Sequence, residues 1–336
     1  MQKIGNRTVK FLNNISLEAF AAVVGPKEGE GPLAKFFDRC FDDSILGQDS
    51  WEKAESLLQK TAAETALSKA GINANDINLI FAGDLLNQCT ASCFGLMELG
   101  VPFVGLYGAC STMALSMISA AMSIEAGAAE KALAVTSSHF CSAERQYRFP
   151  LEYGGVRPLT SQWTVTGSGA VLLSHSGEIS VESCTIGKII DLGIKDANNM
   201  GAAMAPAAAD TIYNYLMDTN TVPDDYDAIF TGDLGEVGSE LLQRLLAEKG
   251  YNIGRKHKDC GVMIFDSSKQ DVHSGGSGCG CSASVLCGYI LNKMRLGQMR
   301  NILFCATGAL MSPTSAQQGE NIPSIAHLVN LRLKGM

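Results

Sequence analysis

The sequence has little of what marks the most easily recognised protein classes. Its 336 residues include only two tryptophans, five histidines and 7% aromatic residues, and only 18% of the residues are charged. Basic residues are the minority, 26 against 34 acidic ones, and the net charge of −8 disfavours binding to nucleic acid or directly to anionic lipid. With 46% hydrophobic residues, the chain can bury a large core, as compact α/β proteins do.

The eleven cysteines lack the spacing of a metal site or a disulfide framework. No C-x-x-C pair occurs, and no histidine stands at a companion interval, so a structural zinc site is not expected. The number of cysteines is odd, and no secretory leader precedes them. We therefore expect free thiols in a reducing compartment, and no metal.

We expect neither an export signal nor a membrane span. Lys3, Arg7 and Lys10 could begin a signal peptide, but polar residues and Glu18 interrupt the apolar stretch that must follow. Residues 99–124 carry no charged side chain and are long enough to cross a bilayer. A proline, several glycines and a Cys-Ser-Thr run divide them, however, so we expect a strand, a turn and a buried helix.

Residues 105–114 are the most informative segment, because they place one cysteine between an apolar strand and a small-residue helix. Residues 101–107 have the pattern of a buried strand, and Gly108 permits a sharp turn. A helix is expected from Ser111 or the next residue to about residue 125. Cys110 would then lie at the positive end of a helix dipole, which stabilises thiolates and other anions. The alternative is a buried structural cysteine.

An internal echo indicates two halves built on one plan. Residues 80–85 (Ile-Phe-Ala-Gly-Asp-Leu) recur as residues 229–234 (Ile-Phe-Thr-Gly-Asp-Leu), and a helical pattern precedes each. Alternating helices and short apolar strands predict an α/β protein with mainly parallel, doubly covered sheets. We place the halves at residues 1–176, which carry Cys110, and 177–336. Periodicity alone does not distinguish a tandem arrangement from one doubly wound sheet.

Residues 108–111 (Gly-Ala-Cys-Ser) resemble the acyl-accepting cysteine motif of the thiolase superfamily, in particular its ketoacyl-synthase III branch. The resemblance implies a duplicated five-layer α/β/α/β/α fold with two mostly parallel, mixed sheets. Thiolase-like subunits dimerise by extending the sheet across a two-fold axis. The resemblance therefore also implies a homodimer.

The two partners that a ketoacyl synthase needs beside its cysteine are missing from the sequence. The branch carries a His-Gln-Ala-Asn string just after the apolar strand of the second half, where this chain has Thr-Gly-Asp after residues 228–230. Its catalytic asparagine aligns with Cys279. A thiol is a weak donor, and losing one oxyanion donor costs on the order of 10²-fold in rate or more. Only Cys305 could act as the second cysteine of a true thiolase, so we do not expect a condensing enzyme.

A longer resemblance covers nearly the whole chain. It is carried by residues 24–29, 31–34, 274–281 and, most specifically, 137–150 (Ser-Ser-His-Phe-Cys-Ser-Ala-Glu-Arg-Gln-Tyr-Arg-Phe-Pro). These strings are similar to the stage V sporulation protein AD family of endospore-forming bacteria. The resemblance implies a non-catalytic component, peripheral on the inner forespore membrane, that acts with integral membrane proteins of the same system to move dipicolinate (pyridine-2,6-dicarboxylate).

The resemblance also implies where dipicolinate binds. A cavity that ends at a helix N-terminus offers free backbone donors to a small anion. The family site surrounds the former nucleophile, which carries over to Cys110 and Ser111. Six further ligand-binding residues are predicted from their chemistry or position: His139, Arg145, Arg148, Gly278, Cys279 and Cys281. No cofactor is implied, and both the free acid and its calcium chelate stay open as the ligand.

Three functions compete at this point. The chain could be a dipicolinate-binding transport component, an acyltransferase of the 3-oxoacyl synthase type that uses Cys110, or a structural subunit with a vestigial pocket. Residues 140–166, rich in arginine and without clear periodicity, could contact the ligand or form a dimer interface. We rank the binding component first, because only the cysteine of the condensing site survives.

Overall fold

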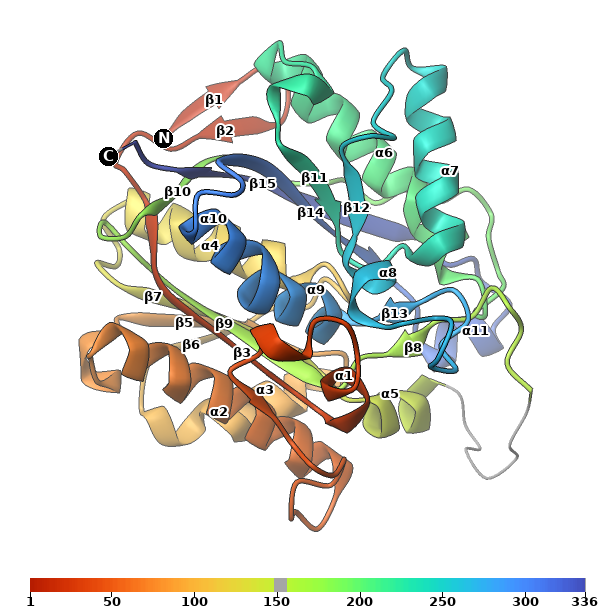
Figure 1. Ribbon diagram of the computed structural model, residues 1–336, viewed down its shortest axis with the longest axis horizontal. Helices are drawn as coiled ribbons and strands as arrows, with labels where there is room; N and C mark the ends of the chain where they lie inside the picture. Colours follow the sequence, from red (N-terminus) through yellow and green to blue (C-terminus); the bar gives the residue numbers. More distant parts are fainter. Residues whose placement is uncertain (148–155, 336) are drawn as a thin grey trace.

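The computed structural model describes residues 1–147 and 156–335 (Figure 1). Its framework is one 13-stranded hydrogen-bonded sheet whose main path divides into two five-stranded mixed halves, called here the first and second sheets, with the same spatial order of strands. The first sheet contains β3 (Ser16–Val24), β9 (Gly167–Ser174), β7 (Ala132–Ser138), β5 (Leu79–Gly83) and β6 (Phe103–Gly105). The second contains β10 (Ile179–Thr185), β15 (Ser324–Leu333), β14 (Asn301–Ala309), β11 (Ala228–Thr231) and β12 (His257–Asp259).

The pairing of the strands repeats as well. In each sheet the last three strands pair in parallel. The second strand pairs antiparallel with both the third strand and the first. A short antiparallel ladder between β3 and β10, at Ser16 with Ser180 and Leu17 with Ile179, joins the two sheets. The turn at residues 175–178 lies between β9 and β10. A division into separate domains at this turn stays a prediction.

Helices cover both sheets and fill the space between them (Figure 1). The central layer holds α4 (Thr112–Glu125), α9 (Cys279–Val285) and α10 (Leu291–Arg295), the last two joined by one π-helical turn at Leu286–Ile290. The outer layers hold α2 (Trp51–Ala70) and α3 (Thr90–Leu96) on one side, and α6 (Met200–Thr219) and α7 (Gly235–Glu248) on the other. This arrangement confirms the predicted five-layer α/β/α/β/α fold.

The remaining elements are short. They are β1 (Gln2–Ile4), β2 (Thr8–Lys10), α1 (Pro26–Gly29), β4 (Arg39–Cys40), α5 (Phe140–Tyr147), β8 (Trp163–Thr164), α8 (Cys260–Ile264), β13 (Gly276–Ser277) and α11 (Pro313–Gln317). Single 3₁₀ turns lie at Ala34–Phe36, Ala74–Asp76, Asn87–Cys89, Met97–Leu99 and Pro223–Asp225. Within residues 1–147 and 156–335, no helix combines the length and apolar character needed to cross a membrane.

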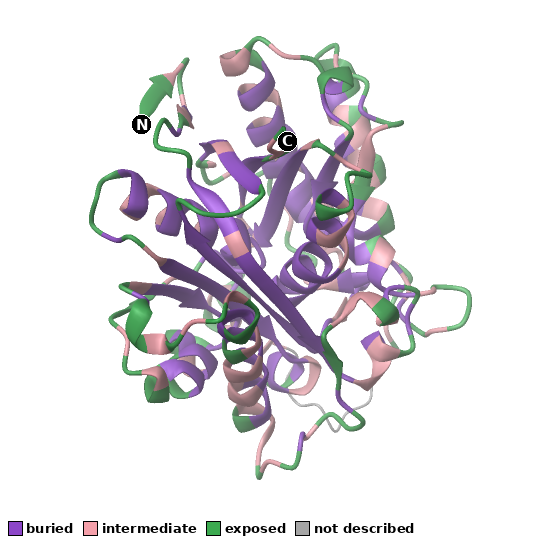
Figure 2. Ribbon diagram, turned by 60° about the vertical axis from the view of Figure 1, so that its left-hand side comes forward, coloured by how far each residue is buried: buried purple, intermediate pink, exposed green. Residues whose placement is uncertain are grey.

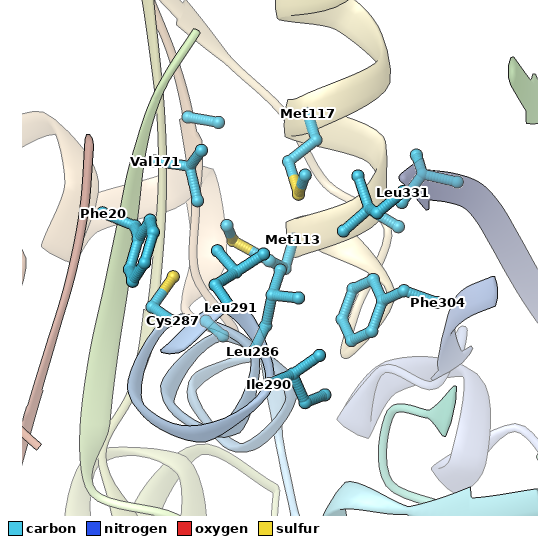
Figure 3. Close-up of a cluster of buried hydrophobic side chains, with 14 of the residues drawn as sticks. Phe20, Met113, Met117, Val171, Leu286, Cys287, Ile290, Leu291, Phe304 and Leu331 are labelled. Carbon is cyan, nitrogen blue, oxygen red and sulfur yellow. The ribbon is translucent and has the colours of Figure 1, made fainter. Parts of the chain in front are cut away.

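The main core lies between the two sheets, where both faces of the central helices are buried (Figure 2). Met113 and Met117 of α4 pack with Phe304 of β14 and with Leu286 and Leu291 of the neighbouring helix (Figure 3). Each such side chain contributes about 1.5–3 kcal/mol through burial of apolar surface. The second part of the uncharged run is therefore a buried central helix, as predicted, because a helix that packs on both faces is apolar nearly all round.

The strand before this helix differs from its prediction. Residues 101–107 have the pattern of a buried strand, but β6 lies at the edge of the first sheet, with Phe103 and Val104 each 38% exposed. An edge strand has a hydrogen-bonding partner on one side only, and its apolar side chains then face solvent or another chain. The apolar run alone does not distinguish these two positions.

Candidate functional site

Cys110 lies at a tight turn between β6 and α4. Ala109, just before it, has a φ of +49°, in the left-handed region that L-residues rarely adopt. Thr112 holds the turn, because its hydroxyl donates to the carbonyl of Ala109 (2.6 Å) and accepts from the amide of Gly108 (3.1 Å). Cys110 is 9% exposed and directly precedes the first turn of α4, as predicted.

The second half of the chain closes against this turn. Gly308 of β14 approaches so closely that an added Cβ would lie 2.4 Å from the carbonyl oxygen of Gly108 and 3.0 Å from the amide nitrogen of Ser111. Only a glycine permits this approach without moving the backbone. The site is therefore built by both halves, and its position depends on their packing.

Asp233 is a residue of this site that was not predicted from the sequence. Asp233 follows β11 at the place where condensing enzymes carry the histidine string, and it is fully buried. It accepts hydrogen bonds from the Thr307 hydroxyl (2.7 Å), the Gly278 amide (2.9 Å) and the Ser277 hydroxyl (3.1 Å), and it lies close enough to the Cys110 thiol to affect its pKa. The repeated Gly-Asp of the internal echo was the signal that could have identified it.

These contacts raise the pKa of the Cys110 thiol, whereas the helix dipole was expected to lower it. Burial, followed by the negative charge of Asp233, raises the pKa of Cys110 well above the usual value of a thiol. The pKa of Asp233 is also raised by its burial, although its hydrogen bonds oppose this. Desolvation and a neighbouring carboxylate therefore oppose the stabilised thiolate that was expected from the dipole of α4.

Cys110 faces a cavity of about 70 Å³ whose lining is mostly apolar. A single water needs about 10–15 Å³, so this space admits several waters or one small molecule. Tyr107 and Tyr147 form one wall, with their hydroxyls 3.1 Å apart, and the Tyr147 hydroxyl donates to the carbonyl of Leu85 (2.5 Å). The described lining residues include the acidic Glu144 and no lysine, arginine or histidine.

Three of the predicted site residues lie together. Cys110 lines the cavity, and Cys279 shares a small buried cluster with it, together with Leu85 and Ala143. The thiol of Cys279 donates to the carbonyl of Ser137 (2.9 Å), so it is turned away from any oxyanion position. Gly278 has a φ of +100° and directs its amide at Asp233.

The other predicted residues lie elsewhere. The Ser111 hydroxyl donates to the carbonyl of Gly108 (2.6 Å), within its own turn. Cys281 is buried in the main core. His139 bonds through Nε2 to the carbonyl of Ser44 (2.6 Å), and burial lowers its pKa. None of these three side chains lines the cavity.

Of the two predicted arginines, the structure describes only Arg145. Arg145 lies on α5, forms an ion pair with Glu52 and lies over the ring of Trp51, outside the cavity lining. Its helix turns it away from Tyr147, which does face the cavity. Arg148 lies outside the described residues, so its predicted role stays a prediction. The sequence did not show which face of α5 points inward, because no helical periodicity was recognised there.

A buried polar network supports the cavity from behind. The Gln59 amide donates to the hydroxyls of Ser92 and Ser137 (2.9 Å each). Ser92 in turn donates to Asp84 (2.6 Å), and Ser137 donates to Glu55 (3.0 Å). Burial and then the charge of Asp84 raise the pKa of Glu55. This chain of donors links α2 to the loop before α3 and to the strand that precedes α5.

A second buried acid fixes the start of α5. Glu28 accepts a hydrogen bond from the amide of Thr166 (3.0 Å), and the Thr166 hydroxyl accepts one from the amide of Phe140 (3.1 Å). The other carboxylate oxygen of Glu28 has no partner. Burial raises the pKa of Glu28 to about 7. Its protonation state is therefore coupled to the fold near neutral pH.

Comparison with known proteins identifies relatives over the whole chain. The family model described as stage V sporulation protein AD matches residues 5–332. Stage V sporulation protein AD of Bacillus subtilis (strain 168) is 47% identical over 328 residues, which cover 97% of this chain and 97% of that protein.

Solved structures with the same fold include condensing enzymes. The 3-oxoacyl-(acyl carrier protein) synthase III of Aquifex aeolicus is 13% identical, with a TM-score of 0.59 over 95% of this chain and 99% of that one. A cerulenin-bound OleA of Xanthomonas campestris is 16% identical, with a TM-score of 0.60 over 96% and 97%. At these identities the likeness shows the fold alone.

The raised pKa of Glu28 predicts a pH dependence of stability. A carboxyl whose pKa is higher in the folded state stabilises fully below its unfolded value near 4.5 and loses this contribution as the pH rises through 7. Between pH 5 and 8 the free energy of unfolding of the native protein should fall by up to about 3 kcal/mol more than that of Glu28→Gln. Urea denaturation at both pH values measures the difference. Parallel pH profiles for the two proteins would contradict the assignment.

The pairing of Cys110 with Asp233 predicts slow alkylation. At pH 8, Cys110 should react with iodoacetamide more slowly than the exposed Cys93, because little thiolate is present. Asp233→Asn removes the negative charge and should accelerate Cys110 by about tenfold for each unit by which its pKa falls. Peptide mass spectrometry follows both cysteines, and Cys93 serves as the internal control. Equal rates for both in the native protein would disprove the buried pairing.

Proposed function

The chain belongs to the stage V sporulation protein AD family of sporulation proteins, and from this membership we propose that it binds dipicolinate without catalysing a reaction. In this proposal it is a component of the system that moves dipicolinate across the inner forespore membrane. It receives the ligand in the cavity beside Cys110 and transfers it to membrane proteins of the same system.

The observation that carries this proposal is a condensing-enzyme fold without a condensing site. Asp233 follows β11 where the histidine string would stand, and it holds the proton on Cys110 instead of withdrawing it. The thiol of Cys279 bonds to Ser137 and offers no donor to an oxyanion. A site that keeps its cavity but neither activates its nucleophile nor stabilises an oxyanion supports binding over turnover.

The charge around the cavity favours the calcium chelate over the free acid. Dipicolinate carries two negative charges, and the acidic Asp233 lies behind Cys110, which faces the cavity. Repulsion between like charges is strong where water is excluded. The chelate has no net charge, and the apolar side chains of Tyr107, Tyr147 and the methionines that line the cavity suit a planar aromatic ring.

A second copy of the chain is the proposed partner at the edge strand β6. Phe103 and Val104 lie on the open edge itself, and Phe94 and Met97, in the segment that precedes β6 in the chain, are 67% and 66% exposed. Unpaired strand edges and exposed apolar clusters are typical of protein interfaces. Pairing of β6 with its copy would continue the first sheet and cover both features.

Replacing Cys110 tests the binding proposal. Cys110→Ala should weaken binding of dipicolinate in Ca²⁺ by up to about tenfold with little loss of stability, since about 1.4 kcal/mol of contact is at stake. Calorimetric titration with and without Ca²⁺ measures it, and thermal unfolding monitors the fold. Cys305→Ala is the matched control, because this cysteine is equally buried but lies in the apolar cluster under α6. The control should lower stability and leave the affinity unchanged.

Two results would contradict the proposal. One is a large fall in melting temperature of Cys110→Ala with no change in affinity. The other is a stable acyl adduct on Cys110 after incubation with acyl-CoA, detected by intact mass spectrometry, which would favour the acyltransferase. Binding that is equally tight without Ca²⁺ would assign the free acid as the ligand.

The dimer proposal has its own test. Phe94→Glu should shift the protein from dimer to monomer, because it places a charge on the exposed apolar segment that precedes β6 in the chain. Light scattering coupled to size-exclusion chromatography measures the mass. Leu296→Glu is the control, since Leu296 is also 67% exposed but follows α10, away from β6. A native protein that is monomeric at micromolar concentration would refute the proposal.

A further inference from the structure

A second hollow, which we call the polar groove, lies far from Cys110 in the second half. Its volume is about 600 Å³. The two hollows lie at opposite ends of the same elements: α6 lines the Cys110 cavity through Met200 and Met204 and the polar groove through Tyr215 and Thr219. No described residue lines both. The polar groove is therefore a separate feature, independent of the function proposed for Cys110.

The floor of the polar groove is one face of the second sheet. On this face the side chains change from apolar to polar at the same position along two neighbouring strands. Alternate residues of a strand share a face. Along β15, Ala326 and Leu328 pack in the apolar cluster under α6, whereas Asn330 and Arg332 on the same face line the polar groove. The neighbouring strand β14 makes the same change between Leu303, which belongs to the cluster, and Asn301. The polar groove begins where the cover of α6 ends.

The buried floor presents polar groups that are oriented by the protein. Asn330 is 5% exposed, and its amide nitrogen donates to the Asn301 side chain (2.8 Å) and to the carbonyl of Ile302 (2.9 Å). No described residue donates to its amide oxygen. Ser183 lies opposite Asn330 across the ladder of β10 and β15, and its hydroxyl bonds to that of Tyr215 (3.0 Å). These groups offer both donors and acceptors to a ligand with hydroxyl groups.

The rim carries charges of both signs. Lys10 of β2 lies opposite Ser183 in the ladder with β10, and Arg332 lies on the other side of the floor. Neither side chain forms an ion pair with another described residue, although acidic residues outnumber basic ones in the chain. The carboxylates of Glu182 and Asp225 also line the polar groove; one oxygen of each accepts a hydrogen bond, from the Ser180 hydroxyl and from the Val222 amide, and the other oxygen is left for a ligand. Two cations can hold one anionic group, and carboxylates accept hydrogen bonds from hydroxyls.

We propose that the polar groove binds a phosphorylated polyol. Its phosphate lies between Lys10 and Arg332, and its hydroxyls bond to Glu182, Asp225 and the amide oxygen of Asn330. Inorganic phosphate alone would leave the second carboxylate oxygens of Glu182 and Asp225 facing an anion that offers them no hydroxyl groups. A neutral polyol would leave both cations unpaired. The same chemistry occurs in free glycerol 3-phosphate and in the headgroup of phosphatidylglycerol.

Calorimetric titration of the full-length protein with glycerol 3-phosphate, glycerol and inorganic phosphate tests this assignment. Glycerol 3-phosphate should bind more tightly than either of the others. Lys10→Ala and Arg332→Ala should each weaken it by about tenfold, as expected for one hydrogen bond between charged groups. The matched controls are Lys3→Ala, on the same hairpin, and Arg300→Ala, beside β14, neither of which lines the polar groove. The controls should bind like the native protein.

Cosedimentation with vesicles separates the two sources of the ligand. Vesicles of phosphatidylglycerol and of phosphatidylcholine are compared for the native protein and the same variants. Binding to phosphatidylglycerol that Lys10→Ala abolishes, without binding of the free phosphate ester, assigns the lipid headgroup. Inorganic phosphate binding as tightly as glycerol 3-phosphate would overturn the polyol assignment. Absence of binding in both experiments, or equal binding by all variants, would overturn the proposal.

Discussion

The contact between the Asp233 carboxylate and the Cys110 thiol is the interaction on which the site depends. Asp233 belongs to the second half and is held there by Thr307, Gly278 and Ser277, while Cys110 belongs to the first half. A buried carboxylate is tolerated only where donors surround it. The donors come from β13, from β14 and from the residue that caps α9, so three separate elements must be in place before the acid can be buried. The cavity beside Cys110 is a consequence of this arrangement.

The same contact separates this chain from the enzymes whose fold it shares. Condensing enzymes need a thiolate and donors that stabilise an oxyanion. Here a carboxylate raises the pKa of the thiol, and the thiol that replaces the catalytic amide is bonded to a backbone carbonyl. The chain has a cavity at the meeting of its two halves, while the electrostatics beside Cys110 oppose the formation of a thiolate. Such a cavity suits a neutral ligand better than an anionic one, and this favours the chelate in the proposed function.

Much of the fold could be predicted from the sequence. The echo of residues 80–85 in residues 229–234 indicated a duplication, and both segments are parallel strands at matching places in the two sheets. The helix after Cys110 begins and ends where its pattern predicted, because a run of small apolar residues without charge is stable only as a buried helix. The site was less predictable. Cys110, Gly278 and Cys279 do come together, whereas Ser111, His139, Arg145 and Cys281 satisfy hydrogen bonds, ion pairs or packing elsewhere.

By itself, the sequence determined the class of fold, the family and the position of Cys110 before a central helix, because local patterns and motif strings carry that information along the chain. Only the tertiary structure decided that Asp233 faces Cys110, that β6 is an edge strand, and that the faces of β14 and β15 become polar beyond α6. These features depend on contacts between residues that are distant in the chain. They also depend on which side chains are buried away from water. Burial shifts pKa values and determines hydrogen-bonding partners, and no local sequence pattern indicates which residues are buried.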